Sequence, residues 1–421
     1  MSMNKVLVFM LFFFLTSGSF TLAFNPVSAS ELIEDSWNTK TPMSQPRCSL
    51  GVVTVGSKIY AIGGLSVNDK YVGTNEQYDP STNTWVTLAS MPTPRSNFAV
   101  VAYQGKIYCI GGERYQNYDG SSDVSRCPCG DVEVYDVVTD SWSAKKNMPF
   151  NGSYLDVVVV AENFFVIDGS NLYVYDPVAD LWTKKDSIPT DKVSTTNGAI
   201  YSSAVANNNR LIVFCSYFTD AGSPCKNKVL IYDLETKVWS EGCAPPYSYA
   251  VSGGAIGVTS GFFAPQKIYT LQYTNNYVYD PIDDIWSVAK NMPTERRAFD
   301  VAVLDDILYV IGGYSPHHFA SHSDFTEPIS INEQYTPIGY SFTSLNSEPT
   351  ATPSLPSEST AALLPSEPVA SKSFLAEPIM IVIVLTVCIV VATVLFFYFR
   401  KRAKRASTEN TQAKVVPVDD C

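Results

Sequence analysis

The only three histidines of the chain, His317, His318 and His322, lie close together in one short segment. Asp324 and Glu327 follow them. Imidazole nitrogens and carboxylates are ligands that zinc and copper take from proteins, so a metal site here is one hypothesis. The alternative, a solvated loop that binds no metal, is the interpretation we favour. We therefore expect no cofactor, and the three histidines are the candidate ligands if a metal is present.

Cysteines form the second group of reactive side chains. Of the nine in the chain, Cys388 and Cys421 belong to its C-terminal part, which leaves seven before them. Disulfides persist in oxidising compartments, and we expect disulfides across long loops rather than metal ligation. The candidates are Cys127, Cys129, Cys215, Cys225 and Cys243. Cys225 with Cys215 or Cys243 is the first pair to examine, but the connectivity stays open.

These side chains belong to a chain that repeats itself. A tyrosine is followed seven residues later by a tryptophan at Tyr78/Trp85, Tyr135/Trp142, Tyr175/Trp182, Tyr232/Trp239 and Tyr279/Trp286. The interval between pairs is about 40 to 57 residues, which is typical of repeat architectures whose units bury a core only against their neighbours.

An apolar segment ending in a two-residue doublet precedes each of these tyrosines, and also Tyr335. The doublet is Gly-Gly at 63–64, 111–112 and 312–313. Seventeen residues before the second glycine stands Arg47, Arg95 or Arg296, and the same count in the other repeats reaches Gly152, Ala199 or Ile256. We therefore expect the first two strands to have the same length in every repeat, within a unit of four short antiparallel strands.

Arginine, apolar strand, Gly-Gly, Tyr-Asp-Pro and tryptophan, in this order, resemble the kelch repeat. The resemblance covers residues 31–340 and implies an all-β propeller with one four-stranded blade per repeat. In kelch receptors the residues at the arginine position help to line the ligand pocket, which suggests ligand-binding roles for Arg47, Arg95, Arg296 and Arg297. The structural alternative is an arginine stem packed on the neighbouring blade with its head bonded to loop carbonyls.

The sixth repeat contains Tyr335 but no tryptophan after it. Trp37 lies ten residues before Arg47, the same interval that separates Trp85 from Arg95. We therefore predict that the segment around Trp37 is the outer strand of the last blade. This arrangement closes a six-bladed ring and removes an exposed strand edge.

Two apolar segments predict a membrane protein. Residues 1–29 have one lysine, an apolar core and the small residues Val27-Ser28-Ala29, which predicts a cleaved signal peptide rather than an uncleaved anchor. Residues 379–399 are apolar and uncharged, and at about 1.5 Å per residue they are long enough for a transmembrane helix. The basic cluster that begins at Arg400 places the tail, 400–421, in the cytoplasm.

Residues 30–340 form the predicted propeller, and residues 341–378, rich in Ser, Pro and Glu, form the predicted stalk. The propeller contains 21 Lys and Arg against 34 Asp and Glu. This acidity argues against nucleic acid as a partner. We expect a single-pass protein of the cell membrane with an extracellular propeller.

Some intervals within the repeats vary. The count from doublet to tyrosine runs 14, 23, 6, 16, 6 and 22 residues, and the count from tryptophan to the next arginine position is 10 in four cases and 17 before Ala199 and Ile256. Both connections emerge on the same face of a propeller, so we expect all the length variation on one face and binding there. Asn151-Gly152-Ser153, on the same face, is the candidate glycosylation sequon.

Two functions remain open. We favour a cell-surface binding or adhesion protein, not an enzyme, whose variable face recognises an extracellular protein or carbohydrate. The alternative is an extracellular carbohydrate-active enzyme, because kelch-like propellers also occur in galactose oxidase and in a sialic acid mutarotase. A copper oxidase draws ligands from several blades, whereas the histidines here share one loop. A mutarotase needs only one or two acid or base side chains and is harder to exclude.

Overall fold

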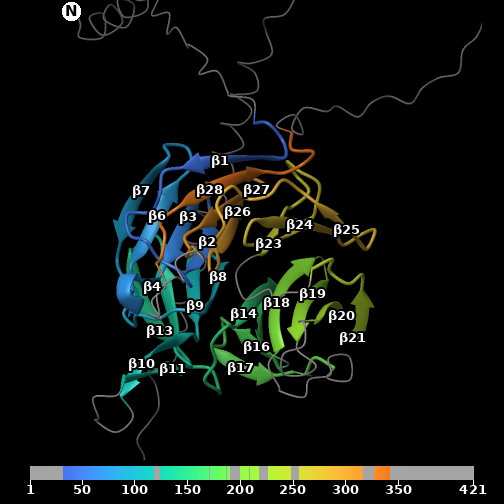
Figure 1. Cartoon of the computed structure of the whole chain (residues 1–421). Coiled ribbons are helices and arrows are strands. Elements are labelled where there is room, and N and C mark those ends of the chain that lie inside the picture. The colour runs from blue at the N-terminus through green and yellow to red at the C-terminus, as the bar shows by residue number, and fades with distance from the viewer. Residues whose placement is uncertain are drawn as a thin grey trace, which may run out of the picture. The chain divides into compact units, whose positions relative to one another are not determined.

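The computed structural model describes residues 32–341, except 118–123, 170, 186, 190–199, 208, 218–225, 248–255 and 316–326. These residues form β-strands and one short 3-10 helix, η1 (Val67–Asp69). Six four-stranded antiparallel sheets surround a common centre in Figure 1. The prediction of a six-bladed all-β propeller is therefore confirmed.

Each blade is a meander of four neighbouring strands, which we name a to d from the centre outward. Blade 1 contains β2 (Gly51–Val55), β3 (Lys58–Ile62), β6 (Asn75–Asp79) and β7 (Thr84–Leu88). Blade 2 contains β8 (Ala99–Tyr103), β9 (Lys106–Ile110), β12 (Val132–Asp136) and β13 (Ser141–Lys145). Blade 3 contains β14 (Asp156–Val160), β15 (Asn163–Asp168), β16 (Asn171–Asp176) and β17 (Leu181–Lys184).

The other three blades have the same order. Blade 4 contains β18 (Ile200–Asn207), β19 (Arg210–Tyr217), β20 (Lys226–Asp233) and β21 (Val238–Gly242). Blade 5 contains β22 (Ile256–Val258), β23 (Ile268–Gln272), β24 (Asn275–Asp280) and β25 (Ile285–Val288). Blade 6 contains β26 (Asp300–Leu304), β27 (Ile307–Ile311), β28 (Asn332–Thr336) and β1 (Ser36–Lys40). Each a strand contacts the a strand of the next blade, and β26 contacts β2, so the ring is closed.

The closing strand is the one that the sequence predicts. β1 pairs with β28 so that Trp37 lies opposite Tyr335, just as Trp85 lies opposite Tyr78 in blade 1. The rings of Trp37 and Tyr335 have centroids 5.0 Å apart. Trp37 therefore completes the last blade, as expected.

The Tyr/Trp pairs also join the blades to one another. In blade 2 the Tyr135 hydroxyl donates to Asp140 Oδ1 at 2.7 Å, and the same oxygen accepts the backbone N–H of Ala89 from the preceding connection at 2.8 Å. Trp142 Nε1 donates to the Ala89 carbonyl at 2.7 Å. Blades 1, 3, 5 and 6 repeat this clamp through Asn83, Asp180, Asp284 and Asp35. In blade 4 the position is Lys237, which has no acceptor oxygen.

The glycine doublets allow close contact between blades. Gly64 has a φ of +100°, and a Cβ there would lie 2.6 Å from the Cys48 carbonyl oxygen. Its N–H donates to the carbonyl of Arg95, in the arginine position of the next blade, at 2.9 Å. Any side chain at this position would meet backbone, so glycine fits here where other residues do not.

Blade 5 departs from the predicted strand lengths. Val258 pairs with Ile268, so residues 259–267 connect the a and b strands, where blade 1 uses only residues 56–57. Counting back seventeen residues therefore stops seven residues short, within the a strand, and Ile256 is not the arginine position of this blade. The prediction of one strand length in every repeat was wrong because the count assumed a short turn in a repeat without its glycines.

The two faces of the ring are now defined. The loop face carries the b–c and d–a connections, including β4 (Leu65–Ser66), β5 (Lys70–Tyr71), β10 (Glu113–Asn117) and β11 (Val124–Pro128). The turn face carries the a–b and c–d connections. Because the 259–267 insertion lies on the turn face, the prediction that all length variation falls on one face was also wrong.

Both ends of the propeller lie on the turn face. The c strand β28 ends there at Thr336, and the d strand β1 begins there at Ser36. The N–H of Ser341 donates to the carbonyl of Phe263, in the blade 5 insertion, at 2.8 Å. The chain therefore enters and leaves the ring on the face opposite the b–c loops.

Within the ranges described above, the structure has no helix that is long and apolar enough to cross a membrane. The predicted signal peptide, transmembrane helix and tail, and the stalk beyond Ser341, lie outside the described residues. His317, His318, His322 and Cys225 also lie outside them.

Candidate binding face

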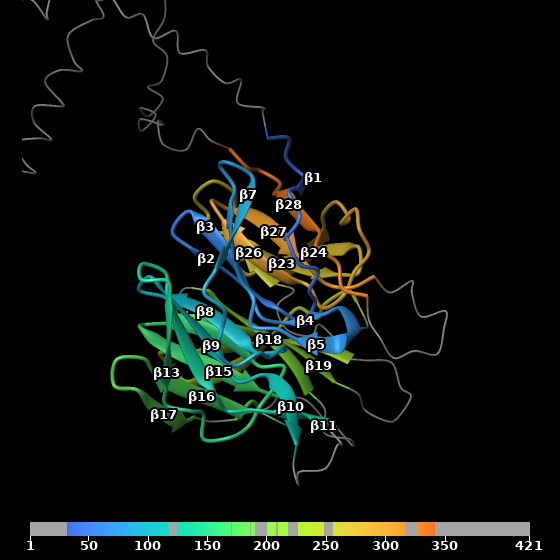
Figure 2. The same cartoon turned by 90° about the vertical axis from the view of Figure 1, so that its left-hand side faces the viewer.

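Two long b–c connections project side by side from the loop face. β4, η1 and β5 of blade 1 and the β10–β11 hairpin of blade 2 lie on the right-hand side of the ring in Figure 2, away from the a–b turns. Residues 65–71, 113–117 and 124–128 together form what we name the blade 1–2 ridge. The 14- and 23-residue intervals of the sequence correspond to these two connections.

Side-chain contacts hold the two halves of the ridge together. The rings of Tyr71 and Tyr115 meet edge to face with centroids 4.7 Å apart. Arg126 Nη2 pairs with Asp69 Oδ2 at 3.0 Å, and the Tyr71 hydroxyl donates to Glu113 Oε1 at 3.3 Å. The loops of two blades thus act as one structured surface.

Burial and the negative charge of Glu113 raise the pKa of Tyr71, so its hydroxyl stays a donor. Burial alone would lower the pKa of Arg126, but Tyr71, Asp69 and Glu113 together raise it, so the guanidinium stays charged. Val67 (57%), Tyr115 (44%) and the Arg126 side chain (47%) are exposed on the ridge. Tyrosine and arginine beside an apolar side chain are the composition that protein interfaces favour.

Three of the four candidate arginines are buried. Arg47, Arg95 and Arg296 have 0% exposure. Arg47 Nη2 pairs with Glu76 Oε2 at 2.7 Å and its Nη1 donates to the Gly63 carbonyl at 2.8 Å. Burial lowers the pKa of Arg47, and it lowers that of Arg296 to about 10, although the paired glutamates oppose the shift. This geometry matches the structural alternative, since no ligand on the surface reaches these guanidinium groups.

Arg95 and Arg296 make the equivalent ion pairs, with Glu133 at 3.0 Å and Glu333 at 2.7 Å. Arg297 differs from all three because it is only partly buried. Its guanidinium lies 4.2 Å from the centre of the Tyr273 ring. Arg297 is therefore the candidate arginine whose ligand-binding role stays a prediction.

Two carboxyls begin a strands in opposite blades. Asp300 Oδ2 accepts the N–H of Val52 in blade 1, and Asp156 Oδ2 accepts the N–H of Ala204 in blade 4, each at 2.6 Å. Burial raises the pKa of Asp156 to about 7. Burial, with a smaller contribution from the charge of Asp156, raises that of Asp300 to about 8. Both groups therefore titrate near neutral pH beside the central axis.

The cysteine and glycosylation candidates are placed as follows. Cys127, Cys129 and Cys215 are buried and Cys243 is exposed. Cys129, Cys215 and Cys243 form no disulfide within the described ranges, and Cys225, the partner first considered, lies outside them.

Asn151 is exposed in the connection from β13 to β14, on the loop face, as glycosylation requires. The described residues contain no group of three potential metal ligands, but the histidine segment is not among them.

The sequence pointed to the ridge loops by their length but not to the residues within them. Asp69, Tyr71, Tyr115 and Arg126 are paired by the packing of two blades, which no repeat spacing encodes. Asp156 and Asp300 could have been identified from the sequence. Each is the one charged residue at the start of an otherwise apolar strand, DVVVV and DVAVL.

Comparisons with known proteins agree with this architecture. Residues 20–218 match the family model described as FKB95, Kelch-repeats domain. The chain is 28% identical over 139 residues to the kelch repeat and BTB domain-containing protein 2 of Horsepox virus, covering 31% of this chain and 23% of that protein. It is also 28% identical over 134 residues to the influenza virus NS1A-binding protein homolog of Xenopus laevis, covering 29% of this chain and 20% of that protein.

The chain thus spans about a fifth of the length of these curated relatives. Among solved structures, the one titled "Structure of YjhT" superposes with a TM-score of 0.56 at 13% identity, covering 70% of this chain and 95% of that chain, which shows a shared fold. Together with the repeat pattern and the six closed blades, these matches support a kelch-repeat propeller.

Proposed function

We propose that this protein is a cell-surface binding or adhesion protein that recognises an extracellular protein or carbohydrate through its loop face. Kelch propellers commonly mediate protein binding, and one relative is named for binding another protein. The blade 1–2 ridge is the part of the loop face that best fits this role.

The observation that carries the proposal is the position of the chain ends relative to the ridge. Both ends of the propeller lie on the turn face, and the ridge lies on the loop face. A stalk that continues from Ser341 would hold the ring by its turn face and direct the ridge away from the attachment point. This orientation leaves the ridge accessible to a partner on an opposing surface.

The membrane part of the proposal comes from the sequence alone. A cleaved signal peptide at 1–29, a stalk at 341–378, a span at 379–399 and a basic tail at 400–421 would place the propeller outside the cell. In this topology the protein is integral to the membrane through one helix, and its acidic propeller has no nucleic-acid partner.

A protein ligand fits the ridge better than a carbohydrate does. Val67 is an exposed apolar side chain that contributes to a protein interface but satisfies no sugar hydroxyl. The Tyr71 and Arg126 side chains are already bonded to Glu113 and Asp69, which leaves fewer free donors and acceptors for hydroxyl groups.

The direct experiment is to probe an array of cell-surface proteins and glycans with the full-length protein in detergent. We expect specific binding to a surface protein that competes with an antibody against the β10–β11 hairpin. Binding to glycans alone would transfer the function to carbohydrate recognition. No ligand of either kind, together with turnover of a sugar, would overturn the proposal.

The second candidate function, a carbohydrate-active enzyme, has one specific observation in its favour. Asp156 and Asp300 titrate near neutral pH, where a carboxyl group is suited to general acid–base catalysis such as sugar anomer exchange. Both carboxylates are also bonded to backbone N–H groups, which gives them a structural role. Anomer exchange that is fast with the wild type and lost in both Asp156→Asn and Asp300→Asn, at unchanged folding, would support the enzyme.

A further inference from the structure

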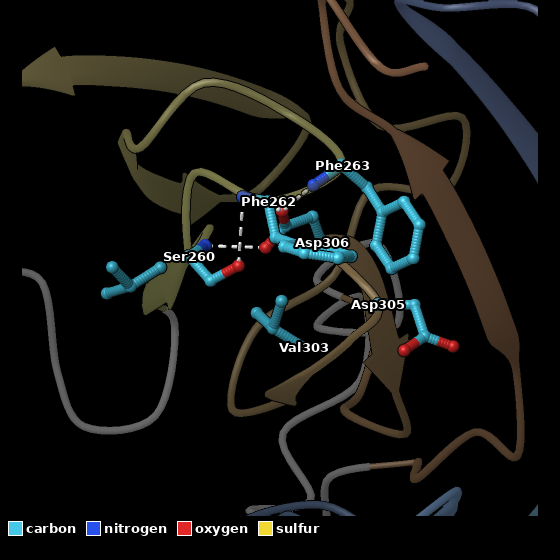
Figure 3. Close-up of a pocket in the computed structure, with 7 residues that line it drawn as sticks. Ser260, Phe262, Phe263, Val303, Asp305 and Asp306 are labelled. Carbon is cyan, nitrogen blue, oxygen red and sulfur yellow. Dashed lines mark hydrogen bonds between the residues drawn. The ribbon is translucent and has the colours of Figure 1, made fainter. Parts of the chain in front are cut away.

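A pocket, drawn in Figure 3, lies at the junction of blades 5 and 6. Its lining residues belong to a–b connections and the adjoining strand ends, so it lies on the turn face, opposite the ridge. Its volume is about 530 Å³. Its lining comes from the 259–267 insertion and from the end of β26 with the turn that follows: Val258, Ser260, Phe262, Phe263, Val303, Asp305 and Asp306. No other a–b connection that the structure describes in full is as long as this insertion.

The insertion has a fixed shape. Asp306 of blade 6 accepts backbone N–H groups from Phe262 at 3.0 Å, Phe263 at 2.7 Å and Ala264 at 3.0 Å, and it also accepts the N–H of Ser260. These bonds hold the loop around a carboxylate of the neighbouring blade, and Figure 3 shows Phe262 and Phe263 beside it. Phe262 is nevertheless 52% exposed, so the fold holds an aromatic ring in solvent at the pocket rim.

The pocket has a negative charge that nothing in the described part of the chain neutralises. Asp305 is exposed and forms no ion pair with any described residue. The partners of Asp306 are backbone N–H groups rather than cations. Burial and the charges of these two aspartates raise the pKa of nearby Tyr340 to about 12.

Two exposed apolar side chains belong to the chain ends that meet the insertion. Ile338 is 49% exposed and Ile33 is 73% exposed. Their segments lie against the insertion, because Gly339 N–H donates to Glu34 and Ser341 N–H donates to the Phe263 carbonyl. Gathered apolar side chains beside a pocket are typical of a surface that binds a macromolecule.

We propose that this pocket binds an arginine or lysine side chain of a partner polypeptide. The aliphatic stem packs against Val258 and Val303, and the cationic head pairs with Asp305 and lies against the face of the Phe262 ring. A side chain that is apolar along its length and positive at its end satisfies both the walls and the charge of the site. A neutral ligand leaves the charge unpaired, and an anionic one is repelled.

The test uses the full-length protein in detergent and a photo-crosslinking peptide, acetyl-Leu-Ala-Arg-Leu-Ala-amide, with a diazirine on the last leucine. The control peptide replaces arginine with citrulline, which has the same shape without the charge. Crosslinked residues are mapped by mass spectrometry. Asp305→Asn and Phe262→Ala are the test variants, and Glu162→Gln, in the a–b turn of blade 3, is the matched control.

We expect the arginine peptide to crosslink within 258–263, and the citrulline peptide to give about tenfold less product because it lacks both the ion pair and the cation–π contact. Asp305→Asn and Phe262→Ala each reduce the product about threefold to fivefold, and Glu162→Gln does not. Equal crosslinking by the citrulline peptide, or crosslinking only elsewhere, would contradict the proposal. Loss in Phe262→Ala without any effect of citrulline would assign the pocket to an uncharged apolar partner and overturn it.

Discussion

The carboxylate of Asp300 accepts a hydrogen bond from the backbone N–H of Val52 at 2.6 Å, and this bond joins the innermost strands of the last and first blades. Asp156 makes the equivalent bond to Ala204, between blades 3 and 4. Two of the six junctions around the centre therefore depend on buried carboxyls with no cation beside them among the described residues.

The first prediction concerns pH. The pKa of Asp300 is raised from 3.8 to about 8, so the folded protein retains a proton that the unfolded chain releases above about pH 4. This group's contribution to stability is therefore full below about pH 4, falls as the pH rises to about 8, and is constant above that. The slope for one such group is at most about 1.4 kcal/mol per pH unit.

Asp300→Asn cannot ionise, so we expect its stability relative to the wild type to increase from about pH 5 to about pH 8.5, measured by urea unfolding. Asp79→Asn, at a partly exposed site on the rim of blade 1, is the control and should show no such increase. A difference between Asp300→Asn and wild type that does not change with pH would show that Asp300 is already ionised in the folded ring.

The second prediction tests ring closure. Trp37→Ala removes the ring contact with Tyr335 and the hydrogen bond from Nε1 to the Lys290 carbonyl, which measures 2.8 Å. We expect a loss of about 3 kcal/mol in the free energy of unfolding. Hydrogen exchange should accelerate first in β28 and β1. Faster exchange in all six blades equally, or in none, would contradict a ring closed by this strand.

The third prediction concerns the inter-blade clamp. Asp140→Ala removes an acceptor from the Tyr135 hydroxyl and from the Ala89 N–H, and we expect it to lower the melting temperature. Lys237→Ala changes the same repeat position in blade 4, where no acceptor exists, and should change stability by less than about 0.5 kcal/mol. Thermal unfolding of the two variants compares them directly. Equal effects would mean that the clamp does not stabilise the ring.

The fourth prediction concerns the buried arginines. Glu76→Gln leaves the guanidinium of Arg47 buried without its counter-charge and should cost about 3–5 kcal/mol. Arg47→Met combined with Glu76→Leu removes both charges and should cost much less than either change alone. Asp79→Asn breaks the partly exposed pair with Lys58 and should cost much less than Glu76→Gln. A loss in Glu76→Gln as small as that in Asp79→Asn would show that the Arg47 pair is solvated.

The sequence predicted the six-bladed ring more accurately than the contacts within the candidate binding face. Strand pairing repeats in every blade, whereas the contacts of the binding face join different blades. Trp37 and the Tyr/Trp spacing are fixed by strand pairing within a blade, which is local and repeats, so they predict six blades and the closing strand. Arg47 was open to two interpretations because burial depends on how neighbouring blades pack. The contacts of Tyr71 with Tyr115 join two different repeats, and spacing within a repeat carries no information about them.

The same reasoning explains the misplaced position in blade 5. Gln272-Tyr273 replaces the glycine doublet, so the count had no fixed reference, and the 259–267 insertion was assigned to a connection on the wrong face. That insertion forms the pocket on the turn face. Blade 5 thus lacks the glycine doublet of the repeat and contains the insertion that forms the candidate pocket.

The most direct test of the proposed function compares variants of the two faces for binding to the surface protein identified on the array. Tyr115→Ala with Arg126→Glu alters the ridge, and Val138→Ala alters an 87% exposed apolar side chain in a c–d turn on the turn face. We predict that the ridge variant weakens binding at least about tenfold, equivalent to about 1.4 kcal/mol, while Val138→Ala binds like the wild type. Unchanged binding by a folded ridge variant would contradict recognition through this part of the loop face.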